Sequence, residues 1–220
     1  MSSSMIKNDH HLSSNRTDYL RQKNVRKFSP PKGHFVTVSC SSSVESVMSR
    51  LRDAERSQDW ASTLEVMTEA KVLKMDLPQT AIESAMRTYC FSGQQWARGS
   101  TLFDSILKKG VKPDESTVTC LFEALAQGRQ GRKALDYLKI LASMHYEEAF
   151  LSTLNDLVIR ALVLEGEMEA ALQLLEEAAR SCDSKGRSVK GSSFTFVANE
   201  LIKAGRQEQA EEVLEMRDYL

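Results

Sequence analysis

A small side chain followed four residues later by a bulky apolar one returns at nearly constant spacing along this chain. The five pairs are Ser62/Val66, Gly99/Phe103, Ala134/Leu138, Ala171/Leu175 and Ala210/Leu214. The intervals between the small residues are 37, 35, 37 and 39 residues. A unit of this length holds one helix-turn-helix, which buries its apolar side only by stacking on its neighbours. The sequence therefore predicts an all-α fold, an α-solenoid of about five helix-turn-helix repeats.

Helix boundaries can also be predicted from the sequence. Apolar spacing of three and four continues through each unit without sustained alternation, so no strand is expected. Ser42, with Glu45 three residues on, has capping-box spacing before the first helix. The return helix of that unit is predicted from about Trp60 to Val72, and Pro78 suits the first turn of the next helix.

The segment Gly110-Val111-Lys112-Pro113-Asp114 marks the change from the second unit to the third. Asp114 or Ser116 is expected to cap the helix that follows, because short oxygen-bearing side chains bind free N–H groups at a helix start. Small residues at the start of each return helix would let the two helices of a hairpin approach closely. These apolar stripes are interpreted as core.

Residues 1–42 differ in composition from residues 43–220. They are rich in Ser and offer little apolar surface, so we expect them to be disordered. Seven Lys and Arg against two Asp lie before residue 45, which leaves a net charge of −6 on the rest of the chain. A basic, Ser-rich and acid-poor leader is typical of an organelle transit peptide. An unprocessed cytosolic tail is the alternative, and a basic tail could also contact nucleic acid or acidic partners.

Several classes of protein are disfavoured by what the sequence lacks. Its four cysteines lie far apart without a C-x-x-C pair, which suggests neither a disulfide framework nor a zinc site. No apolar run approaches the roughly 20 residues that span a bilayer. We expect no membrane span, no metal and no cofactor.

An enzyme is the least favoured class. His145-Tyr146-Glu147 has the H-x-E form of zinc deaminases, but the required downstream C-x-x-C is missing. Gly186 and Gly191 have the outer spacing of a phosphate loop, yet Ser192 stands where its lysine should be. No catalytic residues and no small-molecule substrate are predicted.

Two segments resemble the pentatricopeptide repeat family. Residues 80–114 end in Leu-Lys-Lys-Gly-Val-Lys-Pro-Asp, and units of that family run to roughly 35 residues and close with a Gly-x-x-Pro-Asp turn. Residues 198–210 match the middle of the same repeat. The resemblance covers about 43–220, as four clear units and a weaker first one. Tetratricopeptide arrays share the hairpin, but their Trp and Gly-Tyr signature is missing here.

The resemblance implies a right-handed superhelix whose first helices line a concave groove. It also implies binding of single-stranded RNA, about one base per repeat through two or three side chains, in RNA processing, stability or translation. Members of the family commonly act in plastids or mitochondria. A chloroplast location is therefore expected, with the mitochondrion as the alternative.

The family's reading positions are a polar residue early in the first helix and the Asp that ends the repeat. The positions that match here are Ser84, Thr119, Thr195 and Asp114. The equivalent positions of other units depart from the pattern: Val47, Asp156, Ala149 and Gly186. A register error of one residue would place Glu83 or Asn155 there instead. No base sequence is predicted.

Basic residues at turns are the candidates for phosphate contacts, with ordinary solvated surface as the alternative. They are Arg129, Arg132, Lys185, Arg187 and Lys190. The last three belong to residues 181–193, a polar stretch expected to be a flexible linker. A repeat region of charge −6 lacks the strong counterion release of basic RNA binders.

A protein-interaction scaffold in an organellar complex is the rival hypothesis, because solenoids offer extended concave surfaces to either ligand. A positive stripe along the first helices would favour RNA, and an apolar or mixed groove would favour protein.

Overall fold

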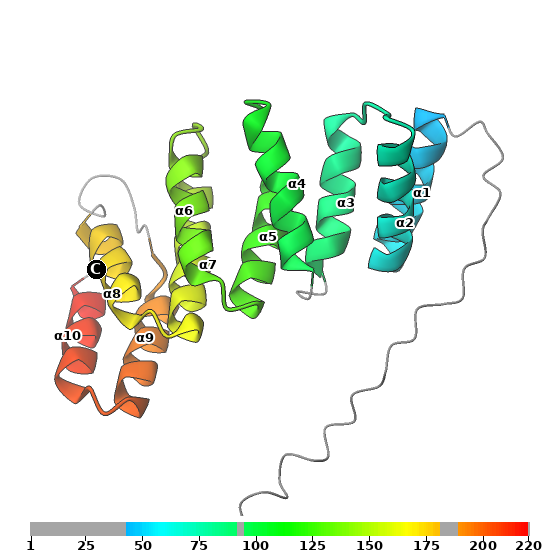
Figure 1. Cartoon of the computed structure of the whole chain (residues 1–220). Helices are drawn as coiled ribbons and strands as arrows, with labels where there is room; N and C mark the ends of the chain where they lie inside the picture. Colours follow the sequence, from blue (N-terminus) through cyan, green and yellow to red (C-terminus); the bar gives the residue numbers. More distant parts are fainter. Residues whose placement is uncertain (1–42, 92–94, 181–188, 220) are drawn as a thin grey trace, which may run out of the picture. The chain divides into compact units, whose positions relative to one another are not determined.

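The computed structural model describes residues 43–91, 95–180 and 189–219. These residues form ten helices and contain no strand, which confirms the all-α helical repeat array (Figure 1). The helices are α1 (Val44–Ser57), α2 (Trp60–Val72), α3 (Gln79–Phe91), α4 (Trp96–Lys108), α5 (Glu115–Gln127), α6 (Gly131–Ala142), α7 (Glu148–Glu165), α8 (Met168–Arg180), α9 (Gly191–Lys203) and α10 (Gln207–Asp218). The predicted leader, residues 1–42, lies outside the described residues.

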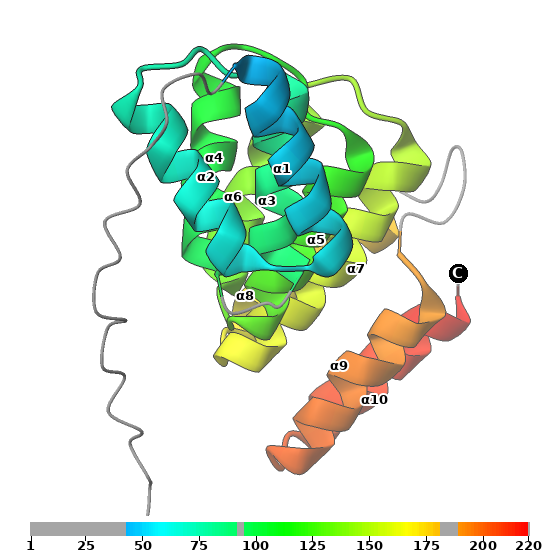
Figure 2. The same cartoon turned by 90° about the vertical axis from the view of Figure 1, so that its right-hand side faces the viewer.

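The ten helices stack as five successive pairs (Figures 1 and 2). Each odd-numbered helix packs on the helix that follows it and also on the next odd-numbered helix. Among the described residues, successive even-numbered helices make no contact of comparable extent with each other. The odd-numbered helices therefore form one continuous layer, here called the first-helix side, and the even-numbered helices form a more widely spaced one. The handedness of the superhelix stays a prediction.

A side chain caps the starts of α1, α2 and α5, and the predicted cap of α1 needs a correction. The cap of α1 is Ser43 and not Ser42, because the Ser43 hydroxyl accepts the N–H of Ser46 at 3.2 Å. α2 covers the predicted span, and its cap is Asp59, which was not predicted from the sequence. Of the two candidates at α5, Asp114 is the cap. Such a cap contributes about 1 kcal/mol to helix stability.

In three of the five units both the small and the bulky residue of the pair are buried, while in the first and last units one member, Ser62 or Leu214, is half-buried. Gly99, Ala134, Ala171 and Ala210 are all buried, whereas Ser62 in the first unit is half-buried. The buried apolar residues form two clusters, one in the first unit and α3 and a larger one from α3 to α10. Leu102 packs against both clusters and so links them.

Tyr146 and Lys112 connect two turns one repeat apart. The Tyr146 hydroxyl donates to the carbonyl oxygen of Pro113 at 2.6 Å, and the Lys112 ammonium donates to the carbonyl of His145 at 3.1 Å. That ammonium also lies 4.1 Å from the Tyr146 ring centroid. Burial raises the pKa of Tyr146 to about 12. In this structure the His145-Tyr146-Glu147 motif therefore joins two repeats.

Gly131, the first residue of α6, marks a very close approach between two helices. A Cβ atom at this position would lie 2.5 Å from both Cα and N of Leu162 in α7. Because those are backbone atoms, no side-chain rotation could relieve the overlap. Glycine is thus required for α6 to pack on α7.

We predict that Gly131→Ala lowers the free energy of unfolding by about 1–3 kcal/mol, through forced separation of α6 and α7. Gly191→Ala is the matched control, since its Cβ would meet nothing nearer than 3.8 Å. Urea unfolding followed by circular dichroism measures both. Equal stability of the two variants would contradict this account of the interface.

Candidate nucleic-acid interface

Four of the positions compared in the sequence analysis lie in equivalent places on successive first helices. They are Ser84 on α3, Thr119 on α5, Asp156 on α7 and Thr195 on α9. The residue two positions further on is fully buried in each case: Met86, Leu121, Val158 and Val197. Val47 is also fully buried, so it is not a surface position.

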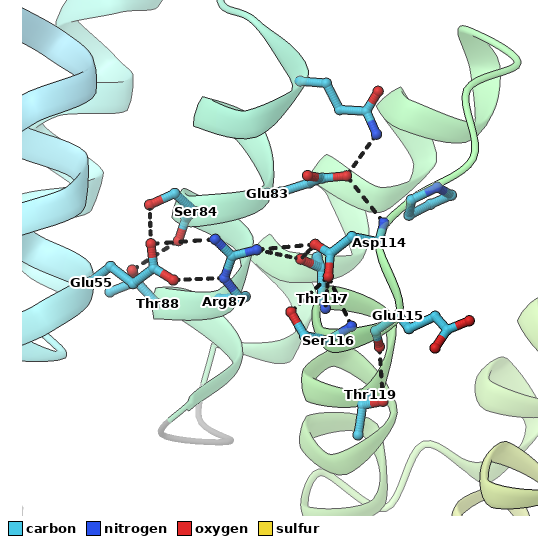
Figure 3. A network of polar contacts seen from close by, with 12 residues as sticks. Glu55, Glu83, Ser84, Arg87, Thr88, Asp114, Glu115, Ser116, Thr117 and Thr119 are labelled. Carbon is cyan, nitrogen blue, oxygen red and sulfur yellow. Dashed lines mark hydrogen bonds and ion pairs between the residues drawn. The ribbon is translucent and has the colours of Figure 1, made fainter. Parts of the chain in front are cut away.

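Ser84 and Asp114 belong to a polar network around Arg87 (Figure 3). The Arg87 guanidinium donates from Nε to Glu55 Oε1 at 2.6 Å and from Nη1 to Asp114 Oδ2 at 3.0 Å. It also donates to the Thr117 hydroxyl at 2.7 Å. The Ser84 hydroxyl donates to the other Glu55 oxygen. This Arg87 network joins α1, α3 and the start of α5.

The network holds two carboxylates in their charged form. Burial alone would raise the pKa of Glu55, but hydrogen bonds from Arg87 and Ser84 and the Arg87 charge outweigh it and lower that pKa. Burial likewise opposes ionisation of Asp114, yet hydrogen bonds from Ser116 and Thr117 and the Arg87 charge lower its pKa. Both carboxylates are therefore ionised at neutral pH and offset the charge of Arg87.

Two predicted reading residues thus have intramolecular partners. Ser84 is buried, and its hydroxyl proton is directed to Glu55. Asp114 caps α5 and pairs with Arg87. Glu83, the reading position in the alternative register, also has intramolecular partners. This buried carboxylate accepts from Gln79 Nε2 at 2.6 Å and from the Asp114 N–H at 3.2 Å.

The C-terminal reading positions are more open. Thr119 is half-buried and donates to the Glu115 carbonyl within its own helix at 2.8 Å. Thr195 is exposed and accepts from Arg217 Nη1 at 3.4 Å. Asp156 joins α7 to the start of α9, where its Oδ1 accepts from the backbone N–H of Lys190 at 3.1 Å and from the Ser193 hydroxyl at 2.6 Å.

An open groove of about 560 Å³ lies on the first-helix side between α5, α7 and α9. Its apolar residues include Leu157 and Leu164, and its polar ones include Glu123 and Gln127. Here it is called the first-helix groove.

Arg160 and Phe196 connect this groove to a smaller cavity of about 210 Å³. The Arg160 guanidinium carbon lies 5.5 Å from the Phe196 ring centroid, close enough for a cation–π contact. The smaller cavity extends to Asp156 and Lys190. This pair was not predicted from the sequence, although a Phe directly after Thr195 and an Arg one turn after Asp156 were visible signals.

No family model and no curated protein matches the chain. The crystal structure of the pentatricopeptide repeat protein PPR10 from maize matches 78% of it with a TM-score of 0.59 and 17% sequence identity. The chain has the fold of a pentatricopeptide repeat protein. It spans about a quarter, 24%, of that structure. PPR10 in complex with an 18-nt psaJ RNA element matches 80% of the chain, with a TM-score of 0.46 and 20% identity.

The structure does not bring together the predicted phosphate contacts of this pentatricopeptide-like array. Arg129 lies exposed in the turn after α5, and Arg132 pairs with Glu167 at 2.5 Å. Lys190 precedes α9, and its ammonium lies 3.8 Å from Asp156 Oδ2.

The distance between the two ends of the first helices explains this separation. A helix of 13 residues such as α5 is about 20 Å long, and Arg129 lies at the end where first helices finish while Lys190 lies where they start. The other two candidates, Lys185 and Arg187, are outside the described residues, as is Gly186. Ala149 lies inside α7, so no turn residue occupies that repeat-end position.

The charge on the first-helix side is mixed. Arg87 is offset by two carboxylates, and Arg160 shares its groove with Glu123. In the described part of the chain, no group of three or more His, Cys, Asp or Glu side chains is placed to hold a metal ion. Within the same residues, no helix combines the length and apolar character needed to cross a membrane.

We predict that Arg87→Met lowers the free energy of unfolding at neutral pH by about 1–2 kcal/mol, because charged hydrogen bonds in a half-buried site are lost. The pKa values of Glu55 and Asp114 are depressed below their ordinary 4.5 and 3.8, so this stabilisation is complete above those values and is lost as the pH falls through the folded-state values. The difference between wild type and variant should therefore shrink in acid.

Arg56→Met is the matched control, since Arg56 is highly exposed and its ion pair with Asp53 in the same helix is long, at 3.6 Å. Its loss should cost less than about 0.5 kcal/mol at any pH. Chemical unfolding across a pH series measures both variants. A pH-independent difference for Arg87→Met would show that its effect comes from packing and not from these carboxylates.

Proposed function

We propose that this pentatricopeptide-like array binds single-stranded RNA along the first-helix groove between α5, α7 and α9. The observation that carries the proposal is the Arg160 guanidinium over the Phe196 ring in an open groove. An aromatic face beside a cation is a suitable platform for a nucleobase and its phosphate.

Phe196 supplies the stacking surface. It is half-buried, lines both the groove and the adjoining cavity, and follows the exposed Thr195. Stacking of one base on such a ring contributes about 1–3 kcal/mol. The Gln127 amide and the Glu123 carboxylate line the same groove and can meet base edges.

Arg160 supplies the charge. In the described residues it has no carboxylate within salt-bridge distance, whereas Arg87 has two. An uncompensated cation can neutralise a phosphate, but a cation already paired must first give up its partner. This difference favours the α5–α9 part of the array over the α1–α3 part as the RNA surface.

PPR10 from maize, whose crystal structure has this fold, has also been crystallised in complex with an 18-nt psaJ RNA element. The present chain spans about a quarter of that protein, so a shorter RNA segment is expected to bind. About five repeats would gain roughly 5–15 kcal/mol from stacking, and association costs about 4–15 kcal/mol. We therefore expect weak binding by this chain alone.

We further propose that the RNA role is in processing, stability or translation within an organelle, the chloroplast first and the mitochondrion second. The Ser-rich, basic and acid-poor leader of residues 1–42 supports this proposal.

A protein-interaction scaffold of an organellar complex is the second candidate. The mixed charge of the first-helix side favours it, because a carboxylate such as Glu123 repels phosphate but accepts hydrogen bonds from a polypeptide. Recovery of a polypeptide and no RNA after crosslinking in an organelle extract would select this function.

We predict that Phe196→Leu weakens binding of a labelled oligouridylate of about ten nucleotides by roughly 5-fold to 150-fold, the loss of one stacked base, while leaving the apolar packing in place. Phe196→Trp, which keeps an aromatic ring at this position, should bind the oligouridylate as the wild type does. Arg160→Ala should weaken binding and reduce the slope of log affinity against log salt by about 0.7, one phosphate contact on a single strand.

Arg180→Ala is the matched charge control, since Arg180 ends α8 on the other layer and pairs with Glu176. Fluorescence anisotropy in a salt series on the full chain measures all four variants. Equal affinities of Phe196→Leu and Arg180→Ala would exclude this groove as the RNA surface.

We predict that residues 1–42 fused to a fluorescent reporter direct it to plastids, with mitochondria as the alternative destination. Microscopy in plant cells provides the measurement, with residues 43–220 fused to the same reporter as the control. A diffuse cytosolic signal from the first fusion would contradict the organelle proposal and would leave RNA binding untouched.

A further inference from the structure

A second open groove, of about 510 Å³, lies on the opposite layer of the array. It runs between α2 and α4, with side chains of α3 at its floor, and is called here the second-helix groove. Its lining is mainly apolar and includes Leu64, Met67, Met75, Leu77, Ile82 and Leu102. α2 and α4 each pack on α3 without contact of comparable extent between them, which leaves the space open.

The lining residues of both flanking helices follow helical spacing. On α2 they fall at i, i+3, i+4 and i+7, from Leu64 to Lys71. On α4 they include Arg98, Thr101 and Leu102, again at i, i+3 and i+4. Two facing stripes of this kind form the walls of a trough that accepts a third helix by interdigitation of side chains.

The polar rim of this groove is positively charged. Lys71, Arg98 and Lys109 are exposed at its edges, against a single carboxylate, Asp76. Within the described residues none of the three cations has a carboxylate within salt-bridge distance, and Arg98 donates only to the amide of Gln95, at 3.1 Å. A ligand with negative charges flanking an apolar stripe complements this arrangement.

We propose that the second-helix groove docks an amphipathic helix of another polypeptide, with apolar residues on one side and Asp or Glu along its flanks. Methionines at Met67 and Met75 can adapt to the shape of such a helix. This inference does not depend on RNA binding to the first-helix groove.

The chemistry of the second-helix groove favours a polypeptide over RNA. The aromatic side chain in its lining, Tyr89, is only 3% exposed and offers no face for a base to stack on. Single-stranded RNA gains most of its sequence-tolerant affinity from such faces. An apolar trough with a charged rim instead matches helix-in-groove recognition.

The test uses the full chain, labelled with 13C at its methionine methyl groups, and a synthetic probe. The probe is a helical peptide with Leu at i, i+3, i+4 and i+7 and Glu at its remaining positions, and its counterpart carries Lys in place of Glu. The Glu peptide should shift the resonances of Met67 and Met75, assigned through Met→Leu substitutions. Met168 and Met216, in the last two repeats, should not shift.

Charge reversal tests the rim. The double variant Arg98→Glu with Lys109→Glu should bind the Glu peptide about 10-fold more weakly than wild type does. The Lys peptide should then be the better ligand. Lys139→Glu with Arg180→Glu, two exposed positions on α6 and α8, is the matched control and should change neither affinity.

Three results would overturn the proposal: unshifted Met67 and Met75 resonances, equal binding of the two peptides, or displacement of the Glu peptide by oligouridylate. The last outcome would make this groove a nucleic-acid site. The RNA proposal is tested independently of this one, by the RNA affinities of Phe196→Leu and Arg160→Ala, because those substitutions leave the second-helix groove intact.

Discussion

Each hairpin of this array has an apolar side that only the next hairpin can cover, and the rest of the structure depends on that burial. The first helices carry it, since α3, α5, α7 and α9 each pack on the first helix before them. Residues such as Leu121 and Val158 are fully buried in this continuous layer. Because side chains from neighbouring repeats fill one core, the register of one repeat determines the position of the next.

Polar contacts also join successive repeats, between residues 27 to 34 positions apart in the chain. Tyr146 reaches Pro113, Asp156 reaches Lys190, and Arg87 reaches Asp114. A polar side chain used in this way is less available to a ligand. Among the described residues, the first-helix groove and the second-helix groove are two places where side chains line open space, and the two proposals assign RNA to the first and a polypeptide to the second.

Much of the fold could be predicted from the sequence, and less of the site. Helix type, the span of α2 and the Asp114 cap follow from spacing and local hydrogen bonding, which act within a few residues. The equivalence of Ser84 and Thr119 also follows from the repeat interval. What spacing could not show is that Ser84 is buried against Glu55, because that contact joins two helices of different repeats.

The sequence alone determined the repeat, the all-α class and the small residues at each helix pair, since these depend on apolar periodicity and side-chain volume. Tertiary structure alone decided which polar residues are paired and which are free. Arg87 and Arg160 are both arginines on first helices, but Arg87 meets carboxylates from two neighbouring helices, whereas Arg160 meets an aromatic ring. Such partners come from positions distant in the chain, and only packing brings them within reach.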